Sequence, residues 1–295
     1  MAFIGVDWGS SSFRAYLIDG EQVLDTVLAS DGLKHMGGRS FEDVLAGHVN
    51  AWLGQVDGIF LSGMVTSRTG WAESPYVPCP TRCDALIEQA VRREALGTTL
   101  WFLPGLCQLS PSADVMRGEE LQLYGLEHAS GRQLAILPGT HSKWATLDQS
   151  IVTGFRTIVT GELYDLLLNG SLAGQIAKGR EHDSAAFTTG VRQGFEQTSL
   201  VASIFGLRAG VLLGEGQPDA VASQLSGLLI GNEIREAIAL FGDIDRPITL
   251  LGGNVLCQRY SEALRLLGLE ATVANQSTTP LGFMRVAQQA CATIT

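Results

Sequence analysis

The feature that most constrains the fold of this chain is a strand–turn–strand pattern that occurs twice. An apolar run at residues 3–7 is followed by the turn 9–12, with the sequence Gly-Ser-Ser-Ser, and then by a run of alternating polarity. From residue 133 the same order returns, around the turn 139–142 with the sequence Gly-Thr-His-Ser. In both places a turn at an aspartate and a third strand-like run follow. The repetition predicts two structurally related halves.

Helical signals alternate with strand signals in both halves, which is typical of α/β proteins. The polar segment 127–132 is the predicted junction, and it divides the chain into domains at 1–129 and 130–295. Pro280, with Thr279 as its cap, predicts the start of a last helix that ends near Cys291. The other expected helices are 41–53, 84–96, 119–126, 162–173, 220–241 and 254–267.

Composition narrows the function classes. The chain has 295 residues and a formal net charge of −10, which argues against sequence-independent nucleic-acid binding because that needs a basic face. No apolar stretch reaches about 18 residues, the length of a membrane span, and no secretory signal opens the sequence. The five cysteines are odd in number and include no Cys-x-x-Cys pair, which indicates reduced thiols. We therefore expect a cytoplasmic protein that binds neither nucleic acid nor membrane.

The first turn carries groups suited to phosphate chemistry. Asp7 ends the first strand, and the main-chain N–H groups and hydroxyls of the turn after it can hold phosphate oxygens. The carboxylate is placed to hold Mg²⁺ beside such a phosphate, and Arg14 adds positive charge one strand later. The same pattern is also typical of a plain hairpin with a surface aspartate. The chain lacks both the Gly-x-x-x-x-Gly-Lys-[Ser/Thr] loop and the Gly-x-Gly-x-x-Gly fingerprint of other nucleotide-binding proteins.

Seven stretches follow one another in order from residue 4 to about residue 233. They are VDWGSSSFRAYL, SGMVTSRTGW, FLPGLC, VMRGEELQLYG, LPGTHSKW, FRTIVTGELYDLLLN and LSGLLIGNE. In these stretches the chain resembles the 2-dehydro-3-deoxygalactonokinase family of the actin-like sugar kinase superfamily. The resemblance implies an α/β fold of two actin-like ATPase (ribonuclease H-like) domains flanking a nucleotide and sugar cleft. It also implies a kinase that uses ATP and Mg²⁺ to phosphorylate 2-dehydro-3-deoxy-D-galactonate at its terminal hydroxyl.

The resemblance assigns phosphate and nucleotide contacts to three places. In the first turn Asp7 is the metal ligand, and the phosphate contacts are Gly9, Ser10, Ser11 and Arg14. In the second turn the contacts to the β- and γ-phosphates are Gly139 and Thr140, and the additional cationic candidates are His141 and Lys143. The adenosine motif is represented by Gly252, Gly253 and Asn254, although a plain strand–glycine–helix turn has the same appearance.

The segment Arg117-Gly118-Glu119-Glu120 stands where this kinase class keeps its catalytic carboxylate. A sugar hydroxyl must lose its proton as it attacks phosphorus, and a carboxylate can accept that proton. Glu119 is the favoured base and Glu120 is the alternative. A third interpretation is that both acids only open a helix, where negative charge suits the dipole.

Substrate contacts are expected at the strand end marked by Ser62. A keto-deoxy sugar acid carries a carboxylate, which a guanidinium can grip with two hydrogen bonds. Arg68 and Arg117 are the candidates for this grip, against the alternative of structural salt bridges. Glu162, near the start of its helix, is either a further substrate contact or only a helix-opening acid.

Three rival interpretations stay open. The nearest is a kinase for another 2-keto-3-deoxy sugar acid, such as the gluconate epimer. The second is a structural or chaperone-like ATPase, for which the chain leaves little room beyond the ATPase core. The third is a non-catalytic sugar sensor. Apart from ATP and a small sugar acid, the expected partner is a second copy of the chain in a homodimer.

Overall fold

The computed structural model describes residues 2–126, 131–197, 199–242, 246–274 and 278–294. The chain divides into two compact units. The first unit comprises Met1–Gly131, Thr146–Phe155 and Asn275–Thr295, and the second comprises Arg132–Ala145 and Arg156–Ala274. The predicted boundary between residues 129 and 130 falls outside the described residues. The C-terminal segment, which we expected in the second domain, is grouped with the first unit because its helix packs there.

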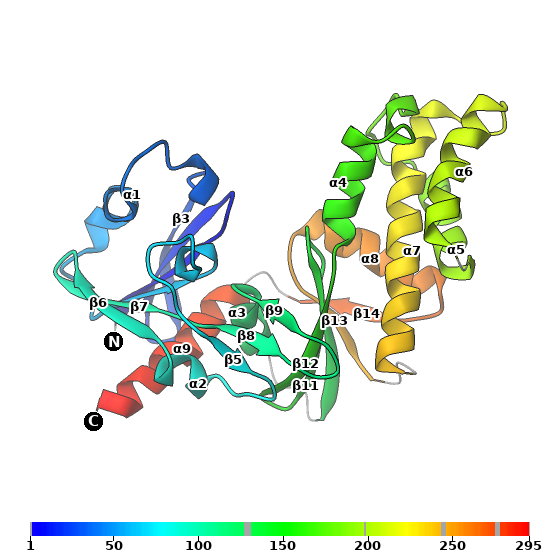
Figure 1. The fold of residues 1–295 in the computed structure, drawn as a ribbon. Helices are drawn as coiled ribbons and strands as arrows, with labels where there is room; N and C mark the ends of the chain where they lie inside the picture. Colours follow the sequence, from blue (N-terminus) through cyan, green and yellow to red (C-terminus); the bar gives the residue numbers. More distant parts are fainter. Residues whose placement is uncertain (1, 127–130, 198, 243–245, 275–277, 295) are drawn as a thin grey trace. The chain divides into compact units, whose positions relative to one another are not determined.

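The first unit is built on a six-stranded sheet with the order β3-β2-β1-β4-β7-β6 (Figure 1). Its strands are β1 (Ala2–Trp8), β2 (Phe13–Asp19), β3 (Gln22–Ala29), β4 (Ile59–Ser62), β6 (Val91–Ala95) and β7 (Thr98–Phe102). β1 pairs antiparallel with β2 and parallel with β4. This register places Asp7 opposite Arg14 on one side and opposite Ser62 on the other. A small second sheet of this unit consists of β5 (Tyr76–Pro78), β8 (Gly105–Gln108) and β9 (Asp114–Met116).

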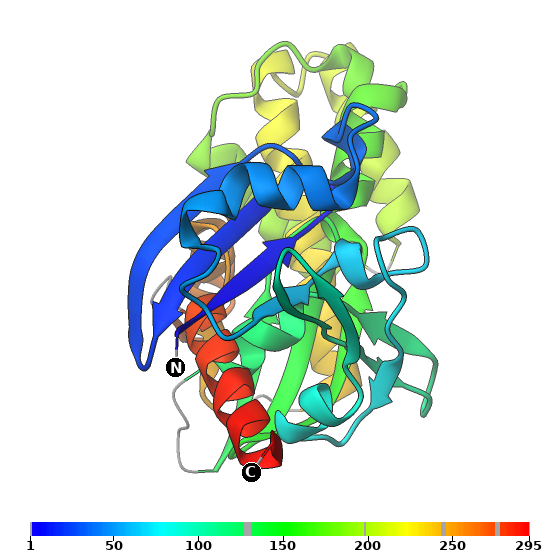
Figure 2. The same cartoon turned by 90° about the vertical axis from the view of Figure 1, so that its left-hand side faces the viewer.

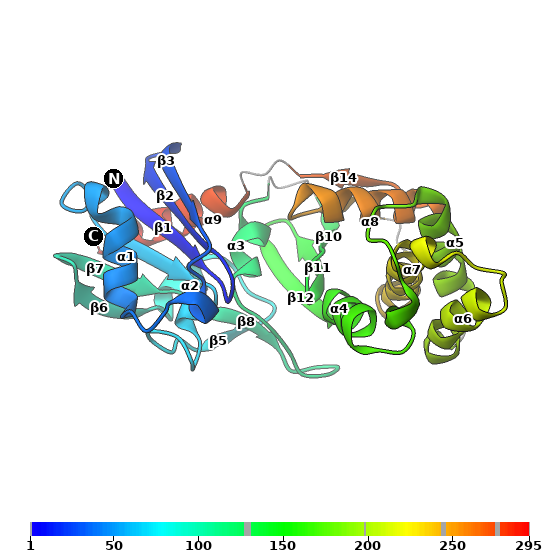
Figure 3. The same ribbon diagram turned by 90° about the horizontal axis from the view of Figure 1, so that it is seen from above.

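Helices cover both faces of the six-stranded sheet, because successive side chains of a strand point to opposite faces. On one face Ile4 and Val6 share a buried core with α1 (Phe41–Val49). On the other face Gly5 lies against Phe283 of α9 (Thr278–Ile294), where a Cβ on the glycine would stand 2.6 Å from the ring. Figures 2 and 3 show α9, in red, beside the blue strands.

A five-stranded sheet has the order β12-β11-β10-β13-β14. Its strands are β10 (Arg132–Leu137), β11 (Ser142–Asp148), β12 (Ile151–Ile158), β13 (Ile248–Leu250) and β14 (Ala271–Val273). β10 pairs parallel with β13, just as β1 pairs parallel with β4. Both sheets therefore place a three-strand meander beside a parallel strand, and this shared order confirms the predicted structural repeat.

The second unit adds a group of helices to this sheet. They are α4 (Thr160–Gly170), α5 (Ser184–Glu196), α6 (Leu200–Leu212), α7 (Val221–Phe241) and α8 (Asn254–Leu266). α5 and α7 pack with their main chains close together, because glycines face the partner helix. A Cβ at Gly190 would stand 2.1 Å from a carbonyl oxygen of α7, and one at Gly227 would stand 2.1 Å from a carbonyl oxygen of α5. Side chains at these positions would push the two helices apart.

Two local predictions are wrong. The helix expected over 84–96 ends after α2 (Asp84–Glu88), and the rest forms β6, which pairs antiparallel with β7. The reason is the hairpin turn at Leu96 and Gly97, both with positive φ, which returns the chain along β7. Thr279, expected as a helix cap, lies inside the first turn of α9. Among the residues that the structure describes, no helix is long and apolar enough to cross a membrane.

Candidate active site

Asp7 stands where three segments of the first unit meet. Its Oδ2 accepts a hydrogen bond from Nη1 of Arg14 at 3.0 Å. Its Oδ1 faces the main chain of Gly63 and Gly118, since a Cβ on these glycines would stand 3.4 and 3.9 Å from that oxygen. Both glycines have positive φ, 89° and 108°, a conformation that side chains disfavour. Burial raises the pKa of Asp7, although the neighbouring guanidinium opposes that shift.

The two adjacent acids Glu119 and Glu120 have different surroundings at the start of α3 (Glu119–Tyr124). Glu120 is fully buried: its Oε1 accepts from Oγ of Ser62 at 2.8 Å, and its Oε2 accepts from the Gly118 N–H at 2.7 Å. Burial, together with the charge of Glu119, raises the pKa of Glu120 to about 7. Glu119 is partly exposed, and its Oε2 accepts from the Arg117 N–H at 3.0 Å. The structure therefore holds Glu120 inside the unit and leaves Glu119 at its surface.

The two arginines considered for the substrate carboxylate also differ. The Arg117 guanidinium donates to Thr66 Oγ1 at 2.6 Å and to Ser74 Oγ at 2.8 Å, and it lies 4.2 Å from the centre of the Tyr76 ring. It is therefore occupied by contacts within the first unit. The side chain of Arg68 is 88% exposed and has a distant ion pair with Glu73, at 3.8 Å.

The first turn is supported by the loop that follows β3. The N–H groups of Leu33 and Lys34 donate to the carbonyl oxygens of Gly9 and Ser10, at 3.1 and 2.9 Å. These bonds fix the main chain of the turn without using any side chain. The turn is thus preformed, as a phosphate site built from N–H groups requires.

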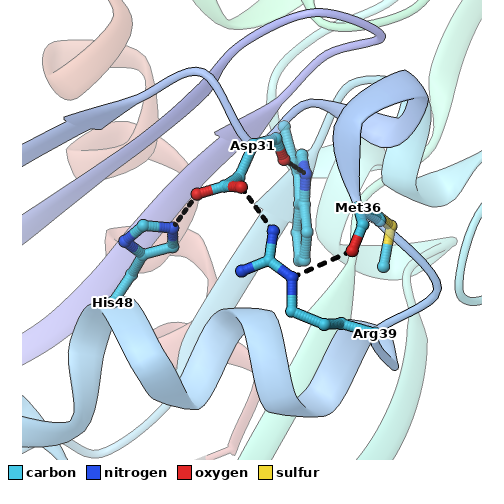
Figure 4. Close-up of polar contacts among 5 residues, drawn as sticks. Asp31, Met36, Arg39 and His48 are labelled. Carbon is cyan, nitrogen blue, oxygen red and sulfur yellow. Dashed lines mark hydrogen bonds and ion pairs between the residues drawn. The ribbon is translucent and has the colours of Figure 1, made fainter.

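A charged cluster surrounds this supporting loop (Figure 4). The Asp31 carboxylate lies between Arg39 and Nε2 of His48, the latter at 2.9 Å. Arg39 also donates to the carbonyl oxygen of Met36, and the Trp8 indole donates to the carbonyl oxygen of Asp31 at 2.8 Å. Hydrogen bonds from Arg39 and His48 lower the pKa of Asp31. The cluster ties β1, the loop and α1 together.

The second turn, in the second unit, is held by the start of α4. The N–H of Glu162 donates to the carbonyl oxygen of Thr140 at 2.9 Å, and its carboxylate contacts Nε2 of His141 at 2.6 Å. Gly161 packs directly on the turn, where a Cβ would stand 2.3 Å from the carbonyl oxygen of Gly139. Lys143 is buried, and its Nζ donates to the carbonyl oxygen of His141 at 3.0 Å.

A buried carboxylate lies behind the second turn. Glu233 of α7 accepts from Nε1 of Trp144 at 2.7 Å and from the hydroxyl of Tyr260 at 2.7 Å. That tyrosine hydroxyl is 2.9 Å from Oγ of Ser142, the last residue of the turn. Burial raises the pKa of Glu233, while hydrogen bonds from Thr160 and its other neighbours oppose that shift.

A pocket of about 240 Å³ opens beside this network. Gly139 and Thr140 of the turn form one part of its wall, and Leu229, Ile230 and Leu256 form an apolar part. Other residues of the wall are Thr160, Tyr164, Arg259 and Tyr260. A wall that combines a phosphate-type turn with apolar side chains suits a nucleotide.

The predicted adenosine residues lie next to the second turn and outside the wall of this pocket. Gly252 has a φ of 128°, and a Cβ there would stand 3.6 Å from the carbonyl oxygen of Pro138. Gly253 precedes α8, and Asn254 is its first residue. Sequence reasoning singled out Gly139 and Thr140 but not the apolar wall residues, Arg259, Tyr260 or Glu233. The only signal was the stretch LSGLLIGNE, in which an acid ends an apolar run.

The residues of the first unit fit a magnesium ion that arrives with a nucleotide. Mg²⁺ in phosphate-transferring proteins is usually held by one or two carboxylates, with water and phosphate as its other ligands. Asp7 supplies one carboxylate, and Glu119 is close enough to influence its pKa. No group of three or more His, Cys, Asp or Glu side chains suited to a metal occurs among the described residues. The donor set therefore suits an ion shared with phosphate rather than a complete protein cage.

Comparisons with known proteins show which family the chain belongs to. The family model described as 2-keto-3-deoxy-galactonokinase matches residues 7–286. The 2-dehydro-3-deoxygalactonokinase of Escherichia coli K12 is 35% identical over 290 residues, and the match covers 97% of both chains. A crystal structure of a provisionally assigned 2-dehydro-3-deoxygalactonokinase from Sinorhizobium meliloti matches with a TM-score of 0.88 and 33% identity, over 99% of both chains.

A more distant match concerns the fold alone. The activator of 2-hydroxyisocaproyl-CoA dehydratase from Clostridium difficile has a TM-score of 0.54 and 14% identity, over 99% of this chain and 97% of its own. This match confirms the predicted α/β fold of the actin-like type. By the near-complete family match and the identity to the E. coli enzyme, the chain belongs to the 2-keto-3-deoxy-galactonokinase family, a family of sugar-acid kinases.

Proposed function

We propose that this chain transfers the γ-phosphoryl group of ATP to the C6 hydroxyl of 2-dehydro-3-deoxy-D-galactonate, giving the 6-phosphate and ADP. The observation that carries the proposal is the pair of acids at the start of α3, in a chain of this kinase family. One acid is exposed enough to meet a substrate, and the other is buried enough to hold the segment in place. An accessible acid on a segment held by a buried acid suits general-base catalysis.

In the proposed reaction Glu119 is the base. The C6 hydroxyl oxygen bonds to the γ-phosphorus while the bond from that phosphorus to the bridging oxygen of ADP breaks. Glu119 takes the hydroxyl proton. Glu120 acts as a positioning residue through Gly118 and Ser62, because its two oxygens already accept hydrogen bonds from them.

Each unit also supplies groups that would bind the phosphates of ATP. In the first, Asp7 would hold Mg²⁺, which when bound neutralises phosphate charge, and Arg14 with the N–H groups of the turn 9–11 would bind phosphate oxygens. In the second, the turn 139–143 would bind phosphate through Gly139 and Thr140, with His141 and Lys143 as nearby cations. The apolar pocket wall would receive the adenine, and the flat guanidinium of Arg259 suits stacking on a base.

For the substrate carboxylate we propose Arg68 in preference to Arg117. Arg117 is occupied by Thr66, Ser74 and Tyr76, whereas Arg68 is 88% exposed. Ser62 and Glu162 would position other groups instead of touching the sugar, since their side chains contact Glu120 and His141. We place this reaction in the cytoplasm, in a chain of two domains that assembles as a homo-oligomer.

The proposal is tested by ADP release from the purified protein with ATP and Mg²⁺. The panel contains 2-dehydro-3-deoxy-D-galactonate, its gluconate epimer and neutral sugars. Stimulation by the galactonate derivative at least tenfold above the epimer is expected. A preference for the epimer would change the substrate that we assign but would leave the proposed mechanism unchanged. ATP turnover that no sugar acid stimulates would contradict the proposal and favour a sensor. An Arg68→Ala variant should raise KM for the sugar acid without changing KM for ATP.

A further inference from the structure

The outer face of α6 is apolar. On its inner side Leu207 is buried in a core shared with α7. On its outer side Val201, Phe205 and Leu212 are 81%, 62% and 64% exposed. These residues are spaced by four and seven positions, so they lie on one stripe of the helix. Ordinary surface helices carry polar residues along such a stripe.

Two further residues extend this surface. Leu213, directly after the helix, is 78% exposed. Gly206 is exposed, and nothing lies within 4 Å of the place where its Cβ would stand. A glycine on an apolar helix face allows a second helix to approach closely, as the glycines between α5 and α7 do in this chain. We call Val201, Phe205, Gly206, Leu212 and Leu213 the α6 face.

The one charged residue of α6 is directed toward its own chain. Nη1 of Arg208 donates to the carbonyl oxygen of Leu172 at 2.6 Å. That leucine is itself 61% exposed, so it enlarges the apolar surface at the edge of the α6 face. Arg208 is three residues from Phe205 and four from Leu212, so it lies on the same stripe, but its guanidinium already has a hydrogen-bond partner within the chain. α6 contains no acidic side chain that a partner would have to neutralise.

We propose that the α6 face is the interface through which two copies of this chain form a homodimer. The two α6 helices pair antiparallel about a two-fold axis, which sets Val201 of one copy near Leu212 of the second copy. Gly206 of both copies lies near the axis, where the helices come closest. Such an interface is self-complementary, because the same apolar stripe is presented by both copies.

The exposed area suits a second copy. A buried Phe covers roughly 150–250 Å² and an aliphatic side chain somewhat less, so the α6 face with Leu172 offers on the order of 500–600 Å². This is about the largest apolar patch that a typical monomer exposes, and such patches are often functional. Two copies together would bury about 1,000–1,200 Å², near the lower end of the range for specific interfaces. A weak, reversible dimer, whose share rises with protein concentration, is therefore expected.

A membrane surface fits less well than a second copy. Helices that lie on membranes combine an apolar face with a polar face rich in Lys and Arg. α6 has Arg208 alone, and the chain carries a net charge of −10, which anionic lipid repels. Two chains of equal negative charge also repel each other, so a contact surface without acidic side chains is one through which they can associate.

The test is sedimentation velocity on the full chain from low micromolar to about 100 µM, with Phe205→Glu beside the wild type. Leu28→Glu is the matched control, since Leu28 is also exposed, at 71%, but lies in β3 of the first unit. We expect the wild type and the control to reach twice the monomer mass of 31.5 kDa, and Phe205→Glu to raise the dimer Kd at least 100-fold. Circular dichroism and ATP turnover of Phe205→Glu should stay unchanged, which separates lost assembly from lost folding.

A second measurement tests whether the two α6 helices pair antiparallel. A Val201→Cys, Leu212→Cys double variant should form a disulfide-linked dimer on mild oxidation, and each single variant should form much less. A wild type that stays monomeric throughout, or a dimer that Phe205→Glu does not weaken, would overturn the proposal. Flotation of the wild type with phosphatidylserine vesicles, lost in Phe205→Glu, would assign the face to a membrane instead. The sedimentation, cross-linking and flotation readouts do not depend on the proposed reaction.

Discussion

The two glycine turns have similar sequences and similar places in their sheets, but different supports. The turn 9–12 of the first unit is held by main-chain hydrogen bonds from the loop around Leu33, with exposed charges outside that loop. The turn 139–142 of the second unit has one such bond, from the N–H of Glu162 to Thr140, and is otherwise held by side chains, through the Glu233 network behind it and the Glu162 carboxylate at its side. The repeat is thus conserved in topology and not in the way the turns are stabilised.

This difference in support indicates which residues each turn depends on. A turn held by main chain tolerates the loss of a neighbouring side chain. A turn held by one buried carboxylate does not, because each donor around that carboxylate would lose its acceptor. The first unit in turn carries the two partly buried acids, Asp7 and Glu119, that the proposed chemistry uses. We therefore expect variants of the first unit to change kcat and variants behind the second turn to change nucleotide binding and stability.

The largest effect is expected for Glu119→Gln. The amide cannot accept the proton of the sugar hydroxyl, so kcat should fall by about 10²–10⁴ while KM for ATP changes little. Steady-state kinetics with both substrates varied measures kcat and the KM for ATP separately. Glu120→Gln is the comparison variant and should keep more than about a tenth of the wild-type kcat. Full activity in both variants would show that neither acid is the base.

The next effect concerns Glu233. Glu233→Ala removes the acceptor of the Trp144 and Tyr260 donors, which should lower the free energy of unfolding by on the order of 3 kcal/mol. The conservative Glu233→Gln keeps one acceptor oxygen and should fold. Because Tyr260 lines the pocket that we propose for the nucleotide, this variant should raise KM for ATP several-fold with kcat within about threefold.

Glu236→Gln is the control for this prediction, since Glu236 lies on the same helix and is exposed. Urea unfolding and ATP kinetics of the three variants are compared. If Glu233→Gln loses stability but keeps the wild-type KM for ATP, Glu233 supports the fold of the unit and does not position the turn.

A smaller effect should appear in the pH dependence of stability. The pKa of Glu120 is about 7 in the folded chain, above the ordinary value of 4.5. The folded state therefore binds this proton more tightly than the unfolded state does. The resulting stability is fully present below about pH 4.5 and is lost as the pH rises through about 7. The melting temperature of the wild type should fall by a few degrees between pH 5 and pH 8, and that of Glu120→Gln should fall less. Parallel curves would contradict this assignment.

The sequence was sufficient to predict the two turns and the acid pair, because their signals are local. Asp7 and its turn follow an apolar strand directly, and so does the turn of Gly139. Glu119 and Glu120 could not be told apart, since they are adjacent. Their difference arises from Ser62, which lies 58 positions before Glu120 and hydrogen-bonds only to the latter of the two.

Other features could not be predicted for physical reasons. α6 is apolar on nearly every side, so it lacks the periodicity that identifies a surface helix. The sequence of β6 was expected to continue the helix that begins at Asp84. Its turn and its pairing with β7 show that it is a strand. The role of Glu233 depends on Trp144, 89 positions away, and on no local pattern. Long-range packing decides such cases.

The smallest effect is expected for Asp31→Asn, which tests the exposed charges beside the first turn. The variant removes the ion pair to Arg39 and weakens the contact with His48, but it leaves the main-chain bonds of Leu33 and Lys34 in place. KM for ATP should therefore stay within about twofold of the wild type. The pKa of Asp31 is lowered, so its contribution to stability exists above the ordinary value of 3.8 and fades as the pH falls below it. The melting temperatures of variant and wild type should differ slightly at pH 7 and converge near pH 3.

Gly32→Ala is the matched disruption of the main-chain support. A Cβ at this position would stand 2.4 Å from the main chain of Ser11, so the turn must shift. This variant should raise KM for ATP far more than Asp31→Asn does. The reverse order would mean that the charges, and not the main chain, hold the first turn. In that case the two turns would share a dependence on side chains, and the contrast between them would disappear.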